Sequence, residues 1–563
     1  MKRLLYILFF SLTITPLMAT EPMDTILLAT LMENGQYEDV VRLTTRELEH
    51  FPKSGAMYYY RSMARVHQSN LPGALEDIHQ AIRYPKESPM TLPDMHLLRA
   101  GMYILLNDTF AAINDCNMAI RRAGKHPRNC RYYVRRANVY AYYDYYPEAA
   151  ADYQTAYKIE PENASLQLEL ARYLALSGRV AEAQQLLEDL CALHPEQIEA
   201  PQLLAALLCY VKEEYNEAVD WAITALTRRY VSDRTVGDAD MIFLAGAIDY
   251  PYVYRALSNE ITRYNAQEQY GLRDLFYLLR GILLGQHGYA EDALADLDSV
   301  SSFSFPRNYE EFIKAERLTC HEKARHWQEV IDMSTEFIKQ NPDSSPYYVT
   351  RSNAYFETEQ YALAETDLKT LYAVYPSAEN AYRLGTLYYQ WQHYPEAIRY
   401  FSMVLEQENL EEEAKRVARL LRGESYLHTQ DTLSATPDFE RILETDTTYR
   451  NTVRHYALYR LGRTKEALEW VEQLIREYPE AQNYYDAACL YAQEQDTARA
   501  LQHLEISLRW GHPSPRQILY DSDLNNLRDH PDFQALVQRY APAGKPKNVP
   551  TIKSRQATAS KKK

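Results

Sequence analysis

A short pattern recurs along the chain at intervals of about 34 residues: a turn residue, then an acidic or polar residue, then a small residue. Copies lie at 35–41, 145–153, 178–184, 214–220, 360–366, 393–401 and 462–468. About twelve residues after the small residue a proline often follows, at Pro52, Pro161, Pro195, Pro342, Pro376 and Pro479. Sequences with such a period stack one supersecondary unit on the next, and each unit buries its apolar face against its neighbours. The 563 residues are also too many for one globular core, so the period predicts a repeat array.

Each repeat contains two helical segments joined by the turn, and the pattern resembles the tetratricopeptide repeat (TPR). Thirteen units are assigned, beginning near residues 21, 55, 93, 130, 164, 199, 274, 311, 345, 378, 416, 448 and 481. The resemblance implies an all-α fold, an α-solenoid in which antiparallel helix hairpins form a right-handed superhelix. Within each unit, the resemblance places the first helix on the concave wall.

The units divide the chain into an N-terminal array, residues 21–232, and a C-terminal array, residues 274–514. Residues 233–273 lack the small-residue pattern, so we expect an irregular helical hairpin there. Residues 515–541 are expected to form a capping helical segment, because an end unit has only one neighbour and needs a polar outer face. This segment resembles the bacterial module that closes TPR arrays, through YDAACLYA (485–492) followed by Asp521, Asp523, Leu524, Leu527, Arg528, Pro531 and Phe533.

Two charged residues recur at fixed positions of the units. Asp stands at position 23 in six units, and all six have Arg at position 7. The pairs are Arg61 and Asp77, Arg99 and Asp115, Arg136 and Asp152, Arg280 and Asp296, Arg351 and Asp367, and Arg422 and Asp438. The turn lies near position 15 or 16, so both residues stand about eight residues from it on opposite arms, level with one another. The spacing predicts six structural Arg–carboxylate bridges, and leaves Arg317 and Arg454 exposed or differently paired.

The ends of the chain differ in charge from its body. Residues 1–20 have Lys2 and Arg3 before a short apolar run, and they are interpreted as a signal peptide that directs export. The last 22 residues, 542–563, hold six Lys, one Arg and no acid, and we expect a basic disordered tail that can contact an anionic surface. The net charge is −16, so the body between the leader and the tail is more acidic still, which disfavours nucleic acid as a partner.

No residue pattern indicates an enzyme, a metal site or a cofactor. The segment HEKARH (321–326) has its histidines five residues apart, whereas the zinc-protease pattern needs four to place both on one helical face. The six cysteines are far apart and fall on faces that we interpret as core, although a disulfide in an exported protein stays open. An enzyme with its site in 233–273 remains a third interpretation of the chain.

Tyrosine is unusually abundant, with 49 residues, and many of these tyrosines fall on positions that the resemblance assigns to the concave wall. The candidate groove residues are Tyr59, His67, Asn138, Tyr142, Tyr210, Asn353, Phe356, Tyr382, Tyr389, Tyr456, Tyr459 and Tyr485. Such a surface suits an extended peptide or a partner helix, or else these tyrosines pack one unit against the next. The carboxylate clamp of chaperone-adaptor TPR domains is missing, because Val134 and Val349 stand where its first Lys would be.

The sequence therefore predicts a non-enzymatic interaction scaffold, exported to the periplasm or cell envelope of a Gram-negative bacterium, that binds a protein or peptide in its groove. No integral membrane segment is expected after signal cleavage. The alternative is an envelope solute-binding, glycan-binding or secretion-assembly component that uses the same groove.

Overall fold

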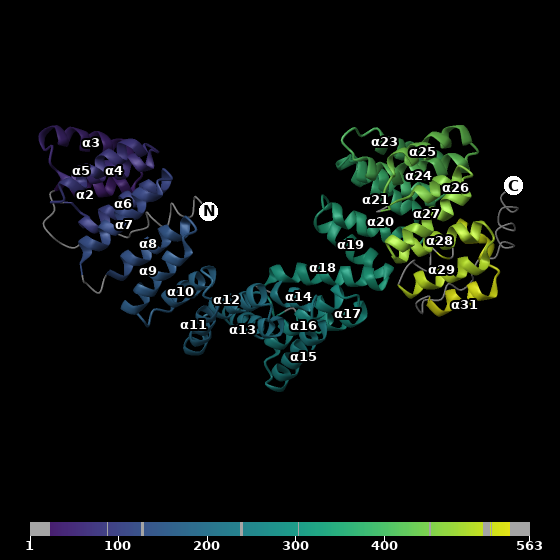
Figure 1. Cartoon of the computed structure of the whole chain (residues 1–563), viewed down its shortest axis with the longest axis horizontal. Helices are drawn as coiled ribbons and strands as arrows, with labels where there is room; N and C mark the ends of the chain where they lie inside the picture. Colours follow the sequence, from purple (N-terminus) through teal and green to yellow (C-terminus); the bar gives the residue numbers. More distant parts are fainter. Residues whose placement is uncertain are drawn as a thin grey trace. The chain divides into compact units, whose positions relative to one another are not determined.

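The computed structural model describes residues 23–86, 88–124, 129–236, 240–301, 303–449, 452–510, 518 and 521–540. Within these residues all regular structure is helical, and the helices follow one another as antiparallel hairpins (Figure 1). The fold is an all-α solenoid, as the period predicts. The expected signal peptide and basic tail lie outside the described residues. The chain divides into two compact units, residues 1–317 and 318–563, so the division falls inside helix α18 (Arg307–Ala324).

Unit 1 contains the hairpins α2 (Met23–Glu33) and α3 (Tyr37–His50), α4 (Gly55–His67) and α5 (Leu71–Arg83), α6 (Leu92–Leu105) and α7 (Thr109–Ala123), α8 (Cys130–Tyr142) and α9 (Tyr146–Ile159), and α10 (Ala164–Leu176) and α11 (Val180–Leu193). It continues with α12 (Glu199–Leu207), the π-helical turn η2 (Leu208–Lys212), α13 (Tyr215–Asp233), α14 (Asp240–Gly246), α15 (Tyr250–Ala266), α16 (Tyr270–Gln286) and α17 (Ala290–Asp298). The expected irregular hairpin is α14 and α15, in which α14 has only seven residues.

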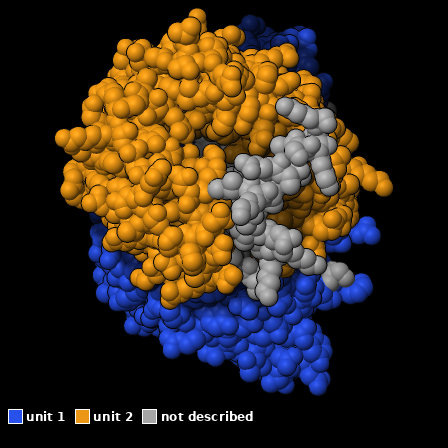
Figure 2. Space-filling model, turned by 90° about the vertical axis from the view of Figure 1, so that its right-hand side faces the viewer, with its two compact units in different colours: residues 1–317 blue, residues 318–563 orange. Residues whose placement is uncertain are grey.

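Unit 2 contains α19 (Trp327–Gln340), then the hairpins α20 (Ser345–Glu357) and α21 (Tyr361–Val374), α22 (Ala378–Gln390) and α23 (Tyr394–Leu405), α24 (Glu412–His428) and α25 (Thr432–Thr445), α26 (Arg454–Arg460) and α27 (Thr464–Glu477), and α28 (Ala481–Gln493) and α29 (Thr497–Arg509). The terminal segment forms the 3₁₀ turn η3 (Ser522–Leu527) and α31 (Pro531–Tyr540). In Figure 2 the side chains of unit 2 surround a central hollow.

The turns of all thirteen predicted units share one backbone conformation. Position 15 of each unit has a positive φ, from +58° at Glu213 to +86° at Gly288. In the unit that begins near residue 199, the Glu214 amide donates instead to Leu208 at position 10, at the π-helical turn η2. In the other twelve units the amide of position 16 donates to the carbonyl of position 11, as from Asn70 to Arg65 and from Asp108 to Tyr103. This is the hydrogen bond of a Schellman motif, which ends the first helix and redirects the chain into the second. The turn expected near position 15 is therefore set by the backbone of that residue.

Small residues let the two arms of a hairpin approach closely. The small residue of the repeated pattern, at position 20, is 0% exposed in all thirteen units; it is alanine except at Val40 and Val330. On the facing arm, a Cβ added to Gly385 would lie 2.7 Å from a ring carbon of Phe401, and one added to Gly423 would lie 2.7 Å from Phe439. These contacts are closer than real Cβ atoms tolerate, so only glycine permits them.

Candidate functional site

The six predicted Arg and Asp pairs are in contact inside their hairpins. In each pair the arginine Nε donates to one carboxylate oxygen at 2.7–2.9 Å, and Nη2 donates to the other at 2.6–2.7 Å. The aspartate side chains are only 1–8% exposed. Both nitrogens point the same way from a planar group, so the guanidinium fits the carboxylate as a two-pronged fork. The bridges join the first and second helix of one hairpin.

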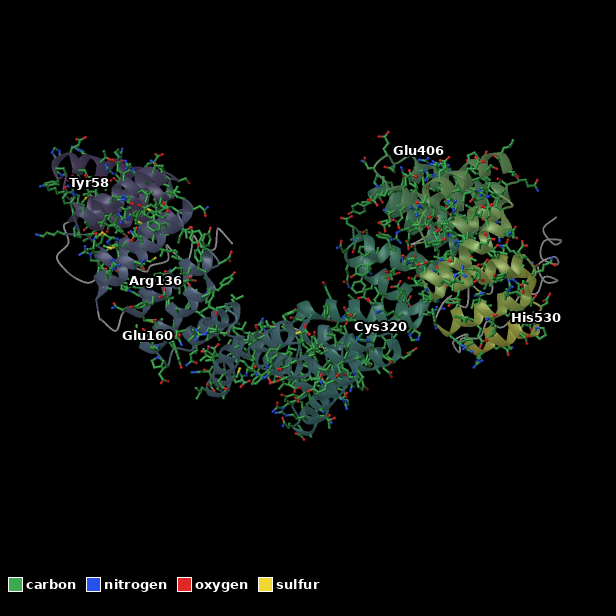
Figure 3. All side chains as sticks on the ribbon, viewed as in Figure 1. Tyr58, Arg136, Glu160, Cys320, Glu406 and His530 are labelled. Carbon is green, nitrogen blue, oxygen red and sulfur yellow. The ribbon has the colours of Figure 1, made fainter. Side chains whose placement is uncertain are left out.

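The third nitrogen of five of these arginines reaches the preceding hairpin. Nη1 of Arg136, which Figure 3 labels on α8, donates to the side-chain oxygen of Asn117 on α7. The equivalent bonds run from Arg61 to Thr45, Arg280 to Ser258, Arg351 to Thr335 and Arg422 to Ser402. In the remaining hairpin His96 approaches Asp115, with its Nδ1 2.9 Å from the carboxylate. One arginine therefore holds two arms and a neighbouring hairpin together.

The two arginines without an aspartate partner at position 23 bind backbone carbonyls. Arg317 Nη2 donates to the carbonyl of Leu297 at 2.6 Å, next to the end of α17. Arg454 Nη1 donates to the carbonyls of Leu443 and Asp446 at 2.5 and 2.9 Å, at the end of α25. The last carbonyls of a helix lack intrahelical donors and carry partial negative charge, so an arginine there satisfies them. These two arginines are differently paired, one of the two outcomes that the sequence leaves open.

The balance between burial and hydrogen bonding differs from one bridge to another. Burial raises the pKa of Asp115, but the hydrogen bonds from Arg99 and His96 outweigh burial, so that its pKa lies below the usual value. At Asp152 burial outweighs the bond from Arg136, and the pKa is raised. Because both oxygens of each carboxylate accept from a guanidinium, the bridges have a structural role.

A second group of polar side chains lies on the first helices of consecutive hairpins in unit 2. We call Tyr389, Glu424, His428, Arg460, Gln493 and Asp523 the inner cluster. They come from α22, α24, α26, α28 and η3, and the residues on these helices stand at unit positions 9, 12 and 13. Arg460 is its hub: Nε donates to Glu424 at 2.5 Å, Nη1 to Gln493 at 3.2 Å and Nη2 to Asp523 at 3.3 Å.

The inner cluster combines aromatic rings with partly buried charge. The Tyr389 ring lies 6.2 Å from that of His428. Burial, followed by the carboxylates of Glu424 and Asp523, raises the pKa of Tyr389 well above its usual value. Burial and the Asp521 carboxylate raise the pKa of Asp523 to about 6. Such a surface can accept and donate hydrogen bonds and can stack against an apolar side chain.

The predicted groove residues have different surroundings. Tyr389, Tyr456, Tyr459, Tyr382 and Phe356 are half-buried on the first helices of unit 2, and Asn353 is exposed there. The hydroxyl of Tyr456 donates to Asp486 at 2.8 Å. In unit 1, Tyr210 is exposed, Tyr142 is half-buried, His67 stacks on Tyr37, and Asn138 accepts a bond from the Tyr153 hydroxyl.

Two groove predictions are wrong. Tyr485 is 1% exposed, because η3 covers it and its hydroxyl donates to Asp521 at 2.8 Å. Tyr59 is 5% exposed, because it belongs to the hydrophobic core around α4 and α6. Both are packing residues.

Sequence reasoning missed most of the inner cluster. Glu424, His428, Arg460 and Gln493 occupy the same unit positions that the groove prediction used, but that prediction selected aromatic residues and asparagines. Applying the positions to every residue type would have found these four. Asp523 lies in the terminal segment, and its approach to Arg460 had no sequence signal.

The described residues contain no group of three or more His, Cys, Asp or Glu side chains arranged to hold a metal ion. His321 and His326 approach one another, with their Nδ1 atoms 3.2 Å apart. All six cysteines are free and buried, as the core interpretation predicts. No helix in the described part of the chain combines the length and hydropathy that a membrane crossing requires.

Comparison with known families supports the repeat. Two tetratricopeptide repeat models match the chain, at residues 146–207 and 349–409. The protein is a tetratricopeptide repeat protein. TPR proteins of this kind are protein-interaction scaffolds, and so is this chain. The comparison with curated proteins found no match for this TPR protein.

Solved structures similar to this TPR protein include MamA, with 19% identity over 31% of this chain and 92% of that chain, and a TM-score of 0.26. Another is YrrB, described as a TPR protein with an unusual peptide-binding site. It shares 14% identity over 33% of this chain and 91% of YrrB, with a TM-score of 0.27. The C-terminal part of a TPR protein from Cytophaga hutchinsonii shares 12% identity over 48% of this chain and 99% of that chain, with a TM-score of 0.33.

Proposed function

We propose that this protein is a non-enzymatic scaffold, exported to the bacterial cell envelope, that binds a partner polypeptide on the inner cluster of unit 2. The observation that carries the proposal is the position of this cluster on the first helices of consecutive hairpins, with half-buried rings beside Glu424, Arg460 and Asp523. Rigid aromatic rings supply contact area at small entropic cost, and the charged groups fix the orientation of a bound chain.

The terminal segment supports a groove with one closed end. Asn526 of η3 donates to the carbonyl of Ala492 at 3.2 Å, and Asp521 accepts from Tyr485, so η3 covers α28. Asp523 of the same turn joins the inner cluster through Arg460. A polypeptide lying along the first helices would therefore end against the charged side chains of Arg460 and Asp523, next to α28.

Site-specific photocrosslinking tests the binding surface. A photoreactive amino acid replaces Tyr389, and a matched control replaces Lys465, whose side chain is 91% exposed on the second helix α27. We expect crosslinking in intact cells to give a discrete partner from position 389 and not from 465, with less product when His428→Ala is added. Equal products from both positions would contradict the proposal, and retention on a glycan resin without a protein partner would favour the glycan-binding alternative.

Export is tested separately by fractionating cells and sequencing the N-terminus of the mature protein. We expect the protein in the periplasmic or envelope fraction, with a sequence that begins near residue 21. A cytoplasmic protein that keeps Met1 would contradict export and leave the binding surface unaffected.

A further inference from the structure

A cleft in unit 1 lies outside the inner cluster and the Arg–Asp bridges. It has a volume of about 710 Å³ and is lined by α13 and α15. These second helices have 19 and 17 residues, longer than most helices of the array, and α14 between them has seven. The volume falls in the range of about 300–1,000 Å³ that is usual for ligand sites.

Polar side chains line both walls of this cleft at helical spacing. Asp220, Thr224 and Thr227 follow one face of α13, and Tyr252, Arg255, Asn259 and Arg263 follow one face of α15. Residues four or seven apart lie on the same side of a helix, so the two rows face each other. At one end the Tyr252 hydroxyl donates to Asp220 at 2.8 Å. Along the rest, the open cleft offers two parallel rows of hydrogen-bonding groups.

The carboxylates of the cleft already have donors. Asp220 accepts from Tyr252, and Glu260 accepts from Arg263 at 3.2 Å. The cations Arg228 and Arg255 instead donate to backbone carbonyls. Arg228 donates to Gln197 and Cys191 at 2.8 and 3.0 Å, and Arg255 uses its Nε for Pro251 at 3.2 Å.

Arg255 is exposed, and its two terminal nitrogens make no hydrogen bond or ion pair with the described residues. A guanidinium with both Nη groups available matches a carboxylate. The Asn259 amide stands one helical turn further along the same wall, where it can bond a peptide group next to that carboxylate. The cleft thus has three arginines and two carboxylates in a chain whose net charge is −16.

We propose that the cleft between α13 and α15 is a second docking site, which takes an extended acidic peptide segment of a partner protein. The carboxylate of an Asp or Glu side chain binds Arg255, while Asn259 and Thr227 bond the peptide backbone. Charge complementarity selects this occupant. The site is independent of the proposed function, because its residues all belong to unit 1 and the inner cluster belongs to unit 2.

The test measures binding of the full chain to fluorescent octapeptide libraries by anisotropy. One library has Asp or Glu at alternate positions, a second has Asn or Gln there, and a third has Lys. We expect the acidic library to bind at least tenfold more tightly than the amide library, with affinity falling as salt rises. Equal binding of the acidic and amide libraries would overturn the proposal.

Charge reversal assigns the binding to the cleft. Arg255→Glu is expected to lose at least tenfold in affinity for the acidic library, whereas Arg172→Glu on α10, a side chain 45% exposed, is expected to bind like the wild type. Asp220→Asn removes a carboxylate from the cleft and is expected to bind the acidic library at least as tightly. Melting curves of each variant check folding, and Arg460→Ala checks that the inner cluster is not responsible. Unchanged binding by Arg255→Glu, or competition by inorganic phosphate with no preference for acidic peptides, would overturn the proposal.

Discussion

The hairpin of α6 and α7 and the hairpin of α26 and α27 both carry an arginine at position 7, but only the first has an aspartate opposite. Arg99 donates two bonds to Asp115 across its own hairpin. Arg454 turns to the preceding hairpin and caps the carbonyls of Leu443 and Asp446. In both hairpins the partly buried arginine at position 7 donates to oxygen acceptors. When the facing arm has a carboxylate, the acceptors lie in the same hairpin; when it does not, they lie in the preceding hairpin.

The choice of acceptor changes which contact the arginine secures. With an aspartate, Nε and Nη2 bond within the hairpin, and in five of the six hairpins Nη1 contacts the neighbour. With a tryptophan at position 23, the guanidinium of Arg454 lies over the Trp470 ring, 5.0 Å from its centroid, and its hydrogen bonds leave the hairpin. The same residue type thus closes one hairpin or joins two.

The largest expected effect is the loss of one carboxylate. Asp115→Ala leaves Arg99 and His96 facing an empty, buried position, so we expect a loss of about 3–5 kcal/mol in the free energy of unfolding. Arg99→Leu combined with Asp115→Leu removes both charges and should cost less. Urea unfolding followed by circular dichroism measures both variants. Equal losses would show that the pair is not desolvated in the folded chain.

A smaller loss is expected at the capping arginine. Arg454→Leu leaves the carbonyls of Leu443 and Asp446 without their side-chain donor, for which we expect about 1–3 kcal/mol. Arg476→Leu on α27, an exposed arginine, serves as the control and should change stability by less than about 0.5 kcal/mol. The same urea titration applies. A cost for Arg454→Leu as large as that for Asp115→Ala would erase the distinction between the two kinds of hairpin.

The smallest expected effect is a difference in how the stability cost of a substitution depends on pH in the two kinds of hairpin. The pKa of Asp115 is lower in the folded chain than its usual value near 3.8, so the bridge contributes its full stability above that value. The contribution is lost as the pH falls through the folded pKa. The cost of Asp115→Asn should therefore shrink below pH 4, at about 1.4 kcal/mol per unit of pKa difference, while the cost of Arg454→Leu stays constant. Melting temperatures between pH 3 and pH 7 test this, and parallel pH profiles would contradict it.

Much of the fold could be predicted because its signals are local and repeated. The left-handed residue at position 15, the buried residue at position 20 and the aspartate opposite six of the arginines all lie within one unit of 34 residues. A single unit therefore contains the physical reason for each feature. The predicted boundaries of the signal peptide, the arrays and the tail remain predictions, and the first and last of these segments lie outside the described residues. The division into two compact units falls inside α18, where no single repeat gave a signal for it.

The rest depended on segments that meet only in the folded chain. Tyr485 reads as a groove residue in its own unit, but Asp521, 36 residues later, accepts a hydrogen bond from its hydroxyl, and η3 begins directly after Asp521. Arg460 gathers partners from α24, α28 and η3 at separations of 33 to 63 residues. The cleft forms between α13 of the first array and α15 of the segment that was expected to be irregular. No single repeat contains these relations.

The third nitrogen of the bridging arginines bears on how this molecule would come apart. In a linear array, each hairpin opens alone if its own stability exceeds its coupling to the next, and whole blocks open together if the coupling dominates. A guanidinium that contacts a neighbour's hydroxyl or amide strengthens that coupling at five junctions. Pulling on the chain should therefore release several hairpins in one step wherever such an arginine links them, and fewer where a junction depends on apolar contact alone.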